Sequence, residues 1–174
     1  VSRSSLVKMM NTTTVTKEQI FEILDQVPDP EVPVLSTLDL GIIREVLIGD
    51  DGVEIIITPT YTGCPAMNMF EVNIIAALQV NGIPNVKVTT VLSPAWTTDW
   101  LSEKGKEKLR AYGIAPPVGK TTDKHVIMGE EKHVKCPQCG SADTEMISHF
   151  GSTACKSLYK CLECKEPFEY FKCH

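Results

Sequence analysis

The chain has 174 residues, 43% apolar and 22% charged, enough to bury one ordinary core or one core plus a small module. Its net charge of −5 arises in residues 1–118, because residues 119–174 carry eight basic and eight acidic side chains. Neither part is basic enough to predict nucleic-acid binding, and no apolar run is long enough to predict a membrane span, so we expect protein partners.

The chain is expected to begin with a disordered leader over residues 1–15, followed by a helix over residues 16–27. Thr16 and Gln19 have the spacing of a capping box, in which each side chain bonds the other residue's backbone N–H. Ile20, Leu24 and their neighbours form an apolar stripe. The Pro-Asp-Pro sequence at residues 28–30 ends this helix, because proline disfavours helical geometry just before it.

A loop over residues 28–40 follows, and it is rich in proline and acidic side chains (PDPEVPVLSTLDL). One interpretation is a rigid surface connector. The other is a fixed platform beside a reactive group, since loops on a rigid scaffold carry functional residues disproportionately. The composition of the loop favours neither interpretation over the other.

The next elements predict a compact α+β domain over residues 16–118, with a small mixed sheet and about three helices. Strands are expected at 42–48 and 53–58, joined by a Gly-Asp-Asp-Gly turn, and at 86–92. A helix over 65–80 is apolar almost all round, which predicts burial. Another helix is expected to be capped by Thr97 or Thr98 and to run through 102–112. Trp96 and Trp100 lie one helical turn apart, and core packing is favoured for them over a docking surface.

The stretch 55–66 (IIITPTYTGCPA) is of special interest because it predicts a strand, a tight loop and the start of a helix. Pro65 suits a first helical position, which would put Cys64 at the helix start. There the free N–H groups and the helix dipole would stabilise the thiolate, the form that binds metals and attacks electrophiles. The alternative is a small buried residue, since free Cys is often buried.

Residues 119–135 are polar and charged, and we interpret them as a linker. Residues 136–174 predict a zinc ribbon with short strands, because two CxxC motifs stand 21 residues apart and can complete one tetrahedral metal site. Seven Cys with no export signal also favour metal binding in a reducing compartment, the cytoplasm, over disulfides. Structural zinc is favoured, and a single iron in the same ligands is the main rival. The four ligands are Cys136, Cys139, Cys161 and Cys164.

Two further cysteines follow the first CxxC motif outside this ligand set. Cys155, in the sequence FGSTAC, is interpreted as a buried structural thiol, with a cluster-ligand or redox role left open. Cys173, next to last in the chain, is expected to be inert.

Several of these motifs carry a resemblance. The sequences DPEVPVLSTLDLGIIREV, TPTYTGCPAM and SPAWTTDWLSEKGKEKLRAYGIAPP together resemble the small domain of SufT-like iron–sulfur cluster assembly factors. With the ribbon sequence CPQCGS…FGSTACKSLYKCLECKEPFEYFK, the chain looks like the PaaD-type accessory subunit of the bacterial phenylacetyl-CoA epoxidase system. The resemblance covers roughly residues 16–172.

The resemblance implies a helper that matures a metal centre for the epoxidase system of aromatic catabolism. Its partners would be other subunits of that system or iron–sulfur assembly proteins. It further implies that Cys64 transiently binds or hands over iron or an iron–sulfur cluster, with a homodimer as one way to share Cys64 between two chains. In that family the loop Cys acts with nearby Asp and Thr side chains, which correspond here to Asp39, Thr60 and Thr62.

The residues agree with an accessory role, because the chain has no complete catalytic set for activating O₂ or transferring hydride. We therefore do not expect catalysis by this chain alone. Two alternatives stay open. One is an electron-transfer component with iron at the four-Cys site. The other is a structural adaptor in which Cys64 is merely buried.

Overall fold

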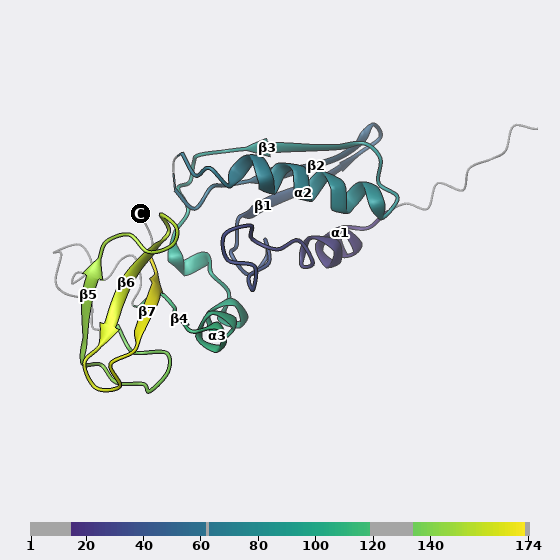
Figure 1. The fold of residues 1–174 in the computed structure, drawn as a ribbon. Helices are drawn as coiled ribbons and strands as arrows, with labels where there is room; N and C mark the ends of the chain where they lie inside the picture. Colours follow the sequence, from purple (N-terminus) through teal and green to yellow (C-terminus); the bar gives the residue numbers. More distant parts are fainter. Residues whose placement is uncertain (1–14, 62, 119–133, 173–174) are drawn as a thin grey trace, which may run out of the picture.

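The computed structural model describes residues 15–61, 63–118 and 134–172, which form two small sheets and three α-helices (Figure 1). The first part of the chain alternates helices and strands, and the last part is built from short strands. The elements are α1 (Lys17–Leu24), β1 (Ile43–Gly49), β2 (Gly52–Ile57), α2 (Met67–Val80), β3 (Val86–Thr90), the 3-10 turn η1 (Thr98–Trp100), α3 (Glu103–Tyr112), β4 (Ile114–Ala115), β5 (Thr144–Ser148), β6 (Lys156–Cys161) and β7 (Pro167–Phe171).

The first sheet has the order β1-β2-β3 and is mixed, as predicted. β1 and β2 form an antiparallel hairpin, and β3 returns parallel to β2 after the crossover through α2. Alternate residues of β2 are buried, Val53, Ile55 and Ile57. They share one core with apolar side chains of α1 and α2, so both helices cover the same face of this sheet.

The start of α1 follows the sequence prediction. The Gln19 N–H donates to the Thr16 hydroxyl at 3.3 Å, and the Thr16 N–H donates to the Gln19 side chain at 3.0 Å, which completes the capping box. The helix ends at Leu24 rather than at residue 27. The carbonyl of its last residue, Leu24, accepts a hydrogen bond from the Thr37 hydroxyl of the following loop at 2.8 Å.

The starts of α2 and α3 differ from the predictions. α2 begins at Met67 rather than at Pro65, and its N-cap residue Ala66 has no side chain able to cap it. α3 is capped by Ser102, whose hydroxyl accepts from the Gly105 N–H at 2.9 Å. Thr98, which we expected as a possible cap for this helix, instead begins η1.

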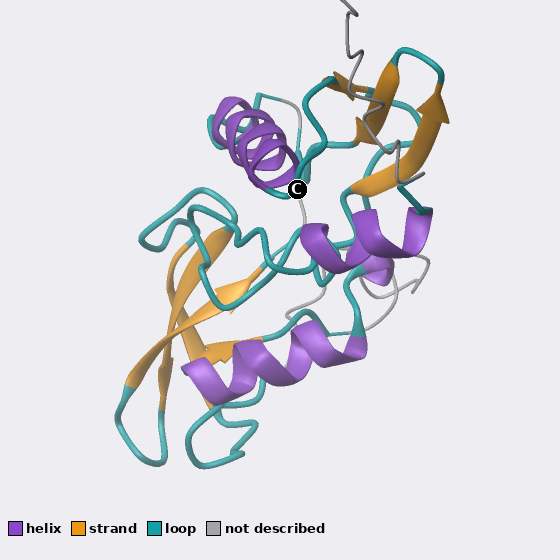
Figure 2. Ribbon diagram, turned by 90° about the vertical axis from the view of Figure 1, so that its right-hand side faces the viewer, coloured by secondary structure: helices purple, strands orange, loops and turns teal. Residues whose placement is uncertain are grey.

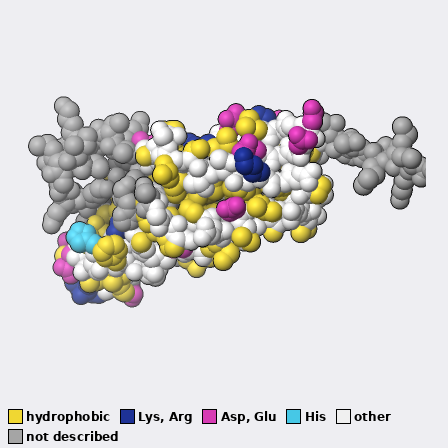
Figure 3. All heavy atoms as spheres, turned by 90° about the horizontal axis from the view of Figure 1, so that it is seen from above, with side chains coloured by type: hydrophobic (Ala, Val, Ile, Leu, Met, Phe, Trp, Pro, Cys, Tyr) yellow, Lys and Arg dark blue, Asp and Glu magenta, His cyan; other side chains and the backbone are white. Residues whose placement is uncertain are grey.

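Helix α2 is only partly buried, although its sequence is apolar almost all round. Phe70, Ile74 and Leu78 lie in the core. Val72 and Val80 are exposed, Val80 by 87%. The prediction of a buried helix therefore holds for one side of α2 only, the side that packs against the three-stranded sheet. Figure 3 shows apolar side chains spread between few charged groups on the face seen from above.

The second sheet has the order β4-β7-β6-β5, and it joins the ribbon to the first domain. β4 follows α3 directly and pairs parallel with β7, so residues that we assigned to the first domain form an edge of the ribbon sheet. The Trp96 ring packs edge-on against Phe171 of β7, and its Nε1–H donates to the Leu40 carbonyl at 2.8 Å. Core packing of Trp96 is thus confirmed. The two sheets form separate groups of strands in Figure 2, with helices beside them.

Within the described residues, no helix combines the length and the apolar character needed to cross a membrane. The expected leader (residues 1–15) and linker (residues 119–135) fall almost entirely outside those residues.

Candidate functional site

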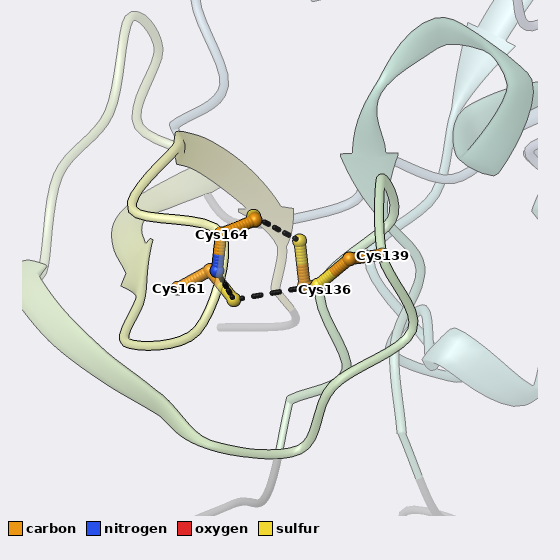
Figure 4. Close-up of side chains that lie close together, drawn as sticks. All are labelled: Cys136, Cys139, Cys161 and Cys164. Atoms are coloured by element: carbon orange, nitrogen blue, oxygen red, sulfur yellow. Dashed lines mark hydrogen bonds between the residues drawn. The ribbon is translucent and has the colours of Figure 1, made fainter.

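The four ribbon cysteines converge from two tight turns, as the spacing of their motifs predicted (Figure 4). All four Sγ atoms lie within 4.8 Å of one another. Cys136 and Cys164 are 3.8 Å apart at their sulfurs, and Cys139 and Cys161 are 3.5 Å apart. Metal–sulfur bonds of about 2.3 Å in a tetrahedron require sulfur–sulfur separations of about 3.8 Å. The donor set therefore fits a single tetrahedral metal ion.

The backbone favours the thiolate form at one of these sulfurs, Cys161, whereas burial and the neighbouring cysteines raise the pKa of the Cys139 and Cys164 thiols. The Cys164 N–H lies 3.5 Å from the Cys161 sulfur, and its hydrogen bond is the main cause that lowers the pKa of the Cys161 thiol to about 7. Gly140 takes a positive φ of 79° after the first motif, which lets the chain fold back and the Gly140 N–H donate to the Cys136 carbonyl at 2.9 Å. With four Cys ligands the site is closed and has no open position for a substrate.

Cys64 lies in the loop between β2 and α2, about half-buried against the core cluster that contains Ala66 and Phe70. Its N–H donates to the Tyr61 carbonyl at 3.2 Å, and its carbonyl accepts from the Met67 N–H at 3.3 Å. Cys64 is thus held in a turn three residues before the first helical residue, not at the helix start itself.

The pKa of the Cys64 thiol is raised, contrary to the thiolate that the sequence predicted. Burial is the main cause, and the negative charge of Glu31 adds to it. Hydrogen bonds from the Ala66 N–H and from the Tyr61 and Thr60 hydroxyls lower the pKa, but by less. The sequence predicted that a backbone N–H would lie near the Cys64 sulfur, and the Ala66 N–H does so. The sequence could not show the burial of Cys64 or the nearby carboxylate of Glu31.

This shift predicts how Cys64 reacts with alkylating reagents. In protein whose four-Cys site is loaded with metal, the rate of alkylation of Cys64 by iodoacetamide should rise about tenfold from pH 7 to pH 8, because the thiolate fraction grows about tenfold per pH unit well below the pKa. Mass spectrometry of the Cys64 peptide after timed pulses measures this rate. A rate that levels off below pH 8 would instead indicate an activated thiolate.

The carboxylates of the acidic loop have different roles: Asp29 bonds the backbone of the loop, and Glu31 lies near a cysteine. Asp29 is buried, and its Oδ1 accepts from the N–H groups of Glu31 and Val32 at 2.6 and 2.9 Å. Burial raises its pKa. Glu31 instead approaches the thiols: its Oε2 lies 3.5 Å from the Cys155 sulfur. Glu31 was noted in the sequence only as part of an acidic loop, and its place beside two cysteines could not be read from spacing.

Asp39 is brought together with α3. Its carboxylate accepts from the Ser36 N–H and the Ser102 hydroxyl, each at 3.1 Å, and pairs with Lys108. Burial raises its pKa, but the bonds from Lys108 and Ser36 outweigh burial and leave the pKa lowered. A Cβ at Gly105 would lie 3.1 Å from the Asp39 Cβ, so the glycine in this helix allows the close approach. Asp39 thus anchors the acidic loop to α3.

Of the remaining predicted residues, the structure describes Thr60 and Cys155. The Thr60 hydroxyl helps to lower the pKa of the Cys64 thiol, and Thr60 lines a cavity of about 410 Å³ together with Thr58, Tyr61 and Trp96. The hydroxyl of Thr58 in this cavity wall is buried without a hydrogen-bond partner among the described residues. Cys155 is buried in the core cluster that Cys64 packs against. Thr62 and Cys173 lie outside the described residues.

Two family models match separate parts of the chain. The model described as "Iron-sulfur cluster assembly protein" matches residues 17–93, which include the acidic loop and Cys64. The model described as "PaaD zinc beta ribbon domain" matches residues 120–172, which include the four-Cys site.

Curated proteins and solved structures agree with these matches. A protein of Escherichia coli (strain K12), named as one subunit of a "Putative 1,2-phenylacetyl-CoA epoxidase", is 47% identical over 168 residues, which are 95% of this chain and 99% of that protein. An "Fe-S protein maturation auxiliary factor" of Porphyromonas gingivalis is 35% identical over 103 residues, 58% of this chain and 97% of that protein. A domain of unknown function from Bacillus anthracis (DUF59) has the same fold, with a TM-score of 0.50 and 24% identity over 53% of this chain and 89% of that one.

Proposed function

This chain belongs to the family of PaaD-type subunits of 1,2-phenylacetyl-CoA epoxidase, and we propose that it is an accessory subunit that helps to load a metal centre of its partners. The cargo is iron or an iron–sulfur cluster, and Cys64 is the residue that binds it. The clients are other subunits of the epoxidase system, which serves phenylacetate degradation, or iron–sulfur assembly proteins. This chain does not carry out the oxidation.

One observation carries the proposal: Cys64 is a partly exposed thiol set among hydrogen-bond donors and a carboxylate, within the part matched by the iron–sulfur assembly model. The Tyr61 and Thr60 hydroxyls act on the pKa of this thiol through hydrogen bonding, and we propose that they orient its sulfur. A transfer site must bind and then release, which suits one cysteine on a loop better than the closed four-Cys site. Thr62 is proposed to support the same loop, and Asp39 to act on it through the fold.

Substituting Cys64 should separate a functional thiol from a buried one. In cells that depend on this chain for growth on phenylacetate, Cys64→Ser is expected to lower partner metal content and epoxidase turnover at least tenfold, since sulfur supplies the bond to the cargo. Metal analysis of the purified partner and a turnover assay measure this. Cys173→Ser is the control for loss of a thiol. Unchanged partner loading with Cys64→Ser would contradict the proposal and favour a structural adaptor.

We further propose that the ribbon metal is zinc with a structural role. The sulfur–sulfur separations suit zinc or a single iron equally, so the distinction requires chemistry rather than geometry. Cys139 is exposed, which keeps the second candidate function, electron transfer through iron at this site, open to test. Elemental analysis and visible absorption of anaerobically purified protein decide between them. Zinc without colour eliminates electron transfer, and iron with sulfur-to-iron absorption eliminates structural zinc.

A further inference from the structure

The ribbon contributes one cysteine that faces away from its own metal site. Cys155 precedes β6, and it lies in the same buried cluster as Ala66 and Phe70, against which Cys64 and Tyr61 also pack. The four ribbon ligands lie elsewhere, and Cys136 and Cys161 belong to a separate buried cluster. The backbone pins Cys155 in place, because its carbonyl accepts from the Lys172 N–H at 3.0 Å. The second domain thus presents a fixed thiol to the first.

Glu31 connects the two thiols. Its carboxylate lies 3.5 Å from the Cys155 sulfur, and its charge raises the pKa of Cys64 as well. Tyr61 bonds Cys64, and the charges of Cys64, Glu31 and Cys155 all help burial to raise the Tyr61 pKa to about 12. Two sulfurs and one carboxylate from three separate segments therefore lie close enough to Tyr61 to act on its pKa, and Cys64, Tyr61 and Cys155 pack in one cluster.

We propose that Cys155 and Glu31 join Cys64 as ligands of the same cargo metal, an inference that rests on the proposed function of Cys64. Two sulfurs and one carboxylate oxygen form a donor set for divalent iron, cobalt or zinc. Binding of one divalent ion replaces two S–H bonds by two metal–sulfur bonds and releases two protons to solvent. A partner's side chain is left to fill the remaining coordination position.

The spacing of these ligands suits transfer rather than storage. Among the described residues, only the four ribbon cysteines form a set of three or more potential ligands whose atoms all lie within 4.8 Å of one another. The set formed by Cys64, Cys155 and Glu31 is therefore more open and must close on an ion. Cys64 lies on a loop, whereas Cys155 is held by the ribbon backbone, so closure is expected to move the Cys64 loop.

Hydrogen bonds hold the neutral Cys155 thiol, because its S–H donates to the Glu31 carboxylate at 3.5 Å and the Thr153 hydroxyl lies 3.1 Å from its sulfur. A metal ion would replace the proton that Cys155 now shares with Glu31. The nearby buried cation, Lys156, pairs with Glu169 at 2.8 Å. A bound metal ion would supply positive charge beside Glu31 and both sulfurs. In this proposal the metal of the four-Cys site has a structural role: it stabilises the ribbon segment that carries the second thiol, Cys155.

Cobalt binding tests the inference in the full chain with zinc already in the ribbon. Wild-type protein, kept reduced and anaerobic, is expected to bind one further Co²⁺ per chain with sulfur-to-cobalt absorption from two thiolates. Cys155→Ser and Cys155→Ala should each weaken this binding at least about tenfold, since even outer-shell partners of ligands are worth about 10–100-fold, and should halve the absorption. Glu31→Gln should weaken binding without changing the absorption per bound ion, and Glu45→Gln, on the exposed surface of β1, is its matched control.

The outcomes distinguish this inference from the proposed function. If both Cys155 variants keep their ribbon zinc and bind Co²⁺ like wild type, Cys155 is not a ligand, while loss of binding with Cys64→Ser would leave the proposed function intact. One ion per two chains, indifferent to Cys155, would replace the inference by a site shared between two copies. Absence of any Co²⁺ binding beyond the ribbon would also overturn it. If Cys64→Ser changes neither Co²⁺ binding nor partner loading, the proposed function itself fails.

Discussion

Removing the metal from the four-Cys site is expected to unfold the ribbon, residues 134–172, as a unit. The ribbon core is small, with Tyr159, Phe168 and Tyr170 as its main buried side chains outside the cysteines. Such modules derive much of their folding free energy from metal binding, because the ligand set does not exist in the unfolded chain. Chelator-treated protein should lose backbone amide protection throughout β5, β6 and β7 by hydrogen-exchange mass spectrometry, and restoring zinc should return it.

The loss should reach the first domain at one defined place. Phe171 of β7 packs against Trp96, and β7 pairs with β4. The fluorescence of Trp96 is therefore expected to shift on chelation, whereas the amides of β1 and β2, which pack with α1 and α2 in a separate core, should stay protected. Cys161→Ser should reproduce the effect of chelation, and Cys173→Ser should not. A ribbon that keeps its protection without metal would show that its apolar core is sufficient.

The features that the sequence predicted well depend on contacts between residues near one another in the chain or on a metal-ligand spacing. The capping box of α1, the hairpin turn and the two CxxC motifs are of this kind. Each motif encodes its own geometry, since the partners lie within a few residues or share one ion. The start of α2 was missed because Pro65 is compatible with a first helical position but does not require one, and the turn from Cys64 to Met67 uses that proline before the helix begins.

The features that the sequence did not predict depend on pairings across the chain. The two-residue strand β4 has no periodicity of its own and exists because β7 lies beside it. Cys64 was identified from its loop, but its raised pKa results from burial and from Glu31, a residue more than thirty positions away. The approach of Glu31 to Cys155 joins segments that are 124 residues apart. Local pattern identifies the reactive residue, and tertiary packing determines its chemistry.

Asp39→Asn is expected to destabilise the chain by about 2–3 kcal/mol, because it breaks a buried ion pair whose cation is partly exposed. The Asp39 side chain is 3% exposed and that of Lys108 is 34% exposed. The Ser36 N–H and the Lys108 ammonium both donate to Oδ2 of Asp39, and the Ser102 hydroxyl donates to Oδ1. An amide oxygen in the Oδ2 position would keep the first two bonds but lose the charge that pairs with Lys108, and the amide nitrogen would then face the Ser102 hydroxyl. Urea unfolding monitored by circular dichroism measures the change. The exposed pair of Glu103 with Lys106 on α3 provides the control, since Glu103→Gln should produce no measurable change.

The pH dependence of this loss identifies its cause. The pKa of Asp39 is lowered in the folded chain, so its ionised form stabilises the fold above the unfolded pKa of about 3.9, and this contribution disappears as the pH falls through the folded value. The difference in stability between wild type and Asp39→Asn should therefore be constant from pH 8 to pH 5 and shrink below pH 4. A variant of normal stability that no longer binds the cargo at Cys64 would instead place Asp39 in the transfer site. If Asp39 acts by anchoring the acidic loop, any loss of cargo binding should accompany the loss of stability. The loosened loop would then no longer hold Glu31 beside the thiols.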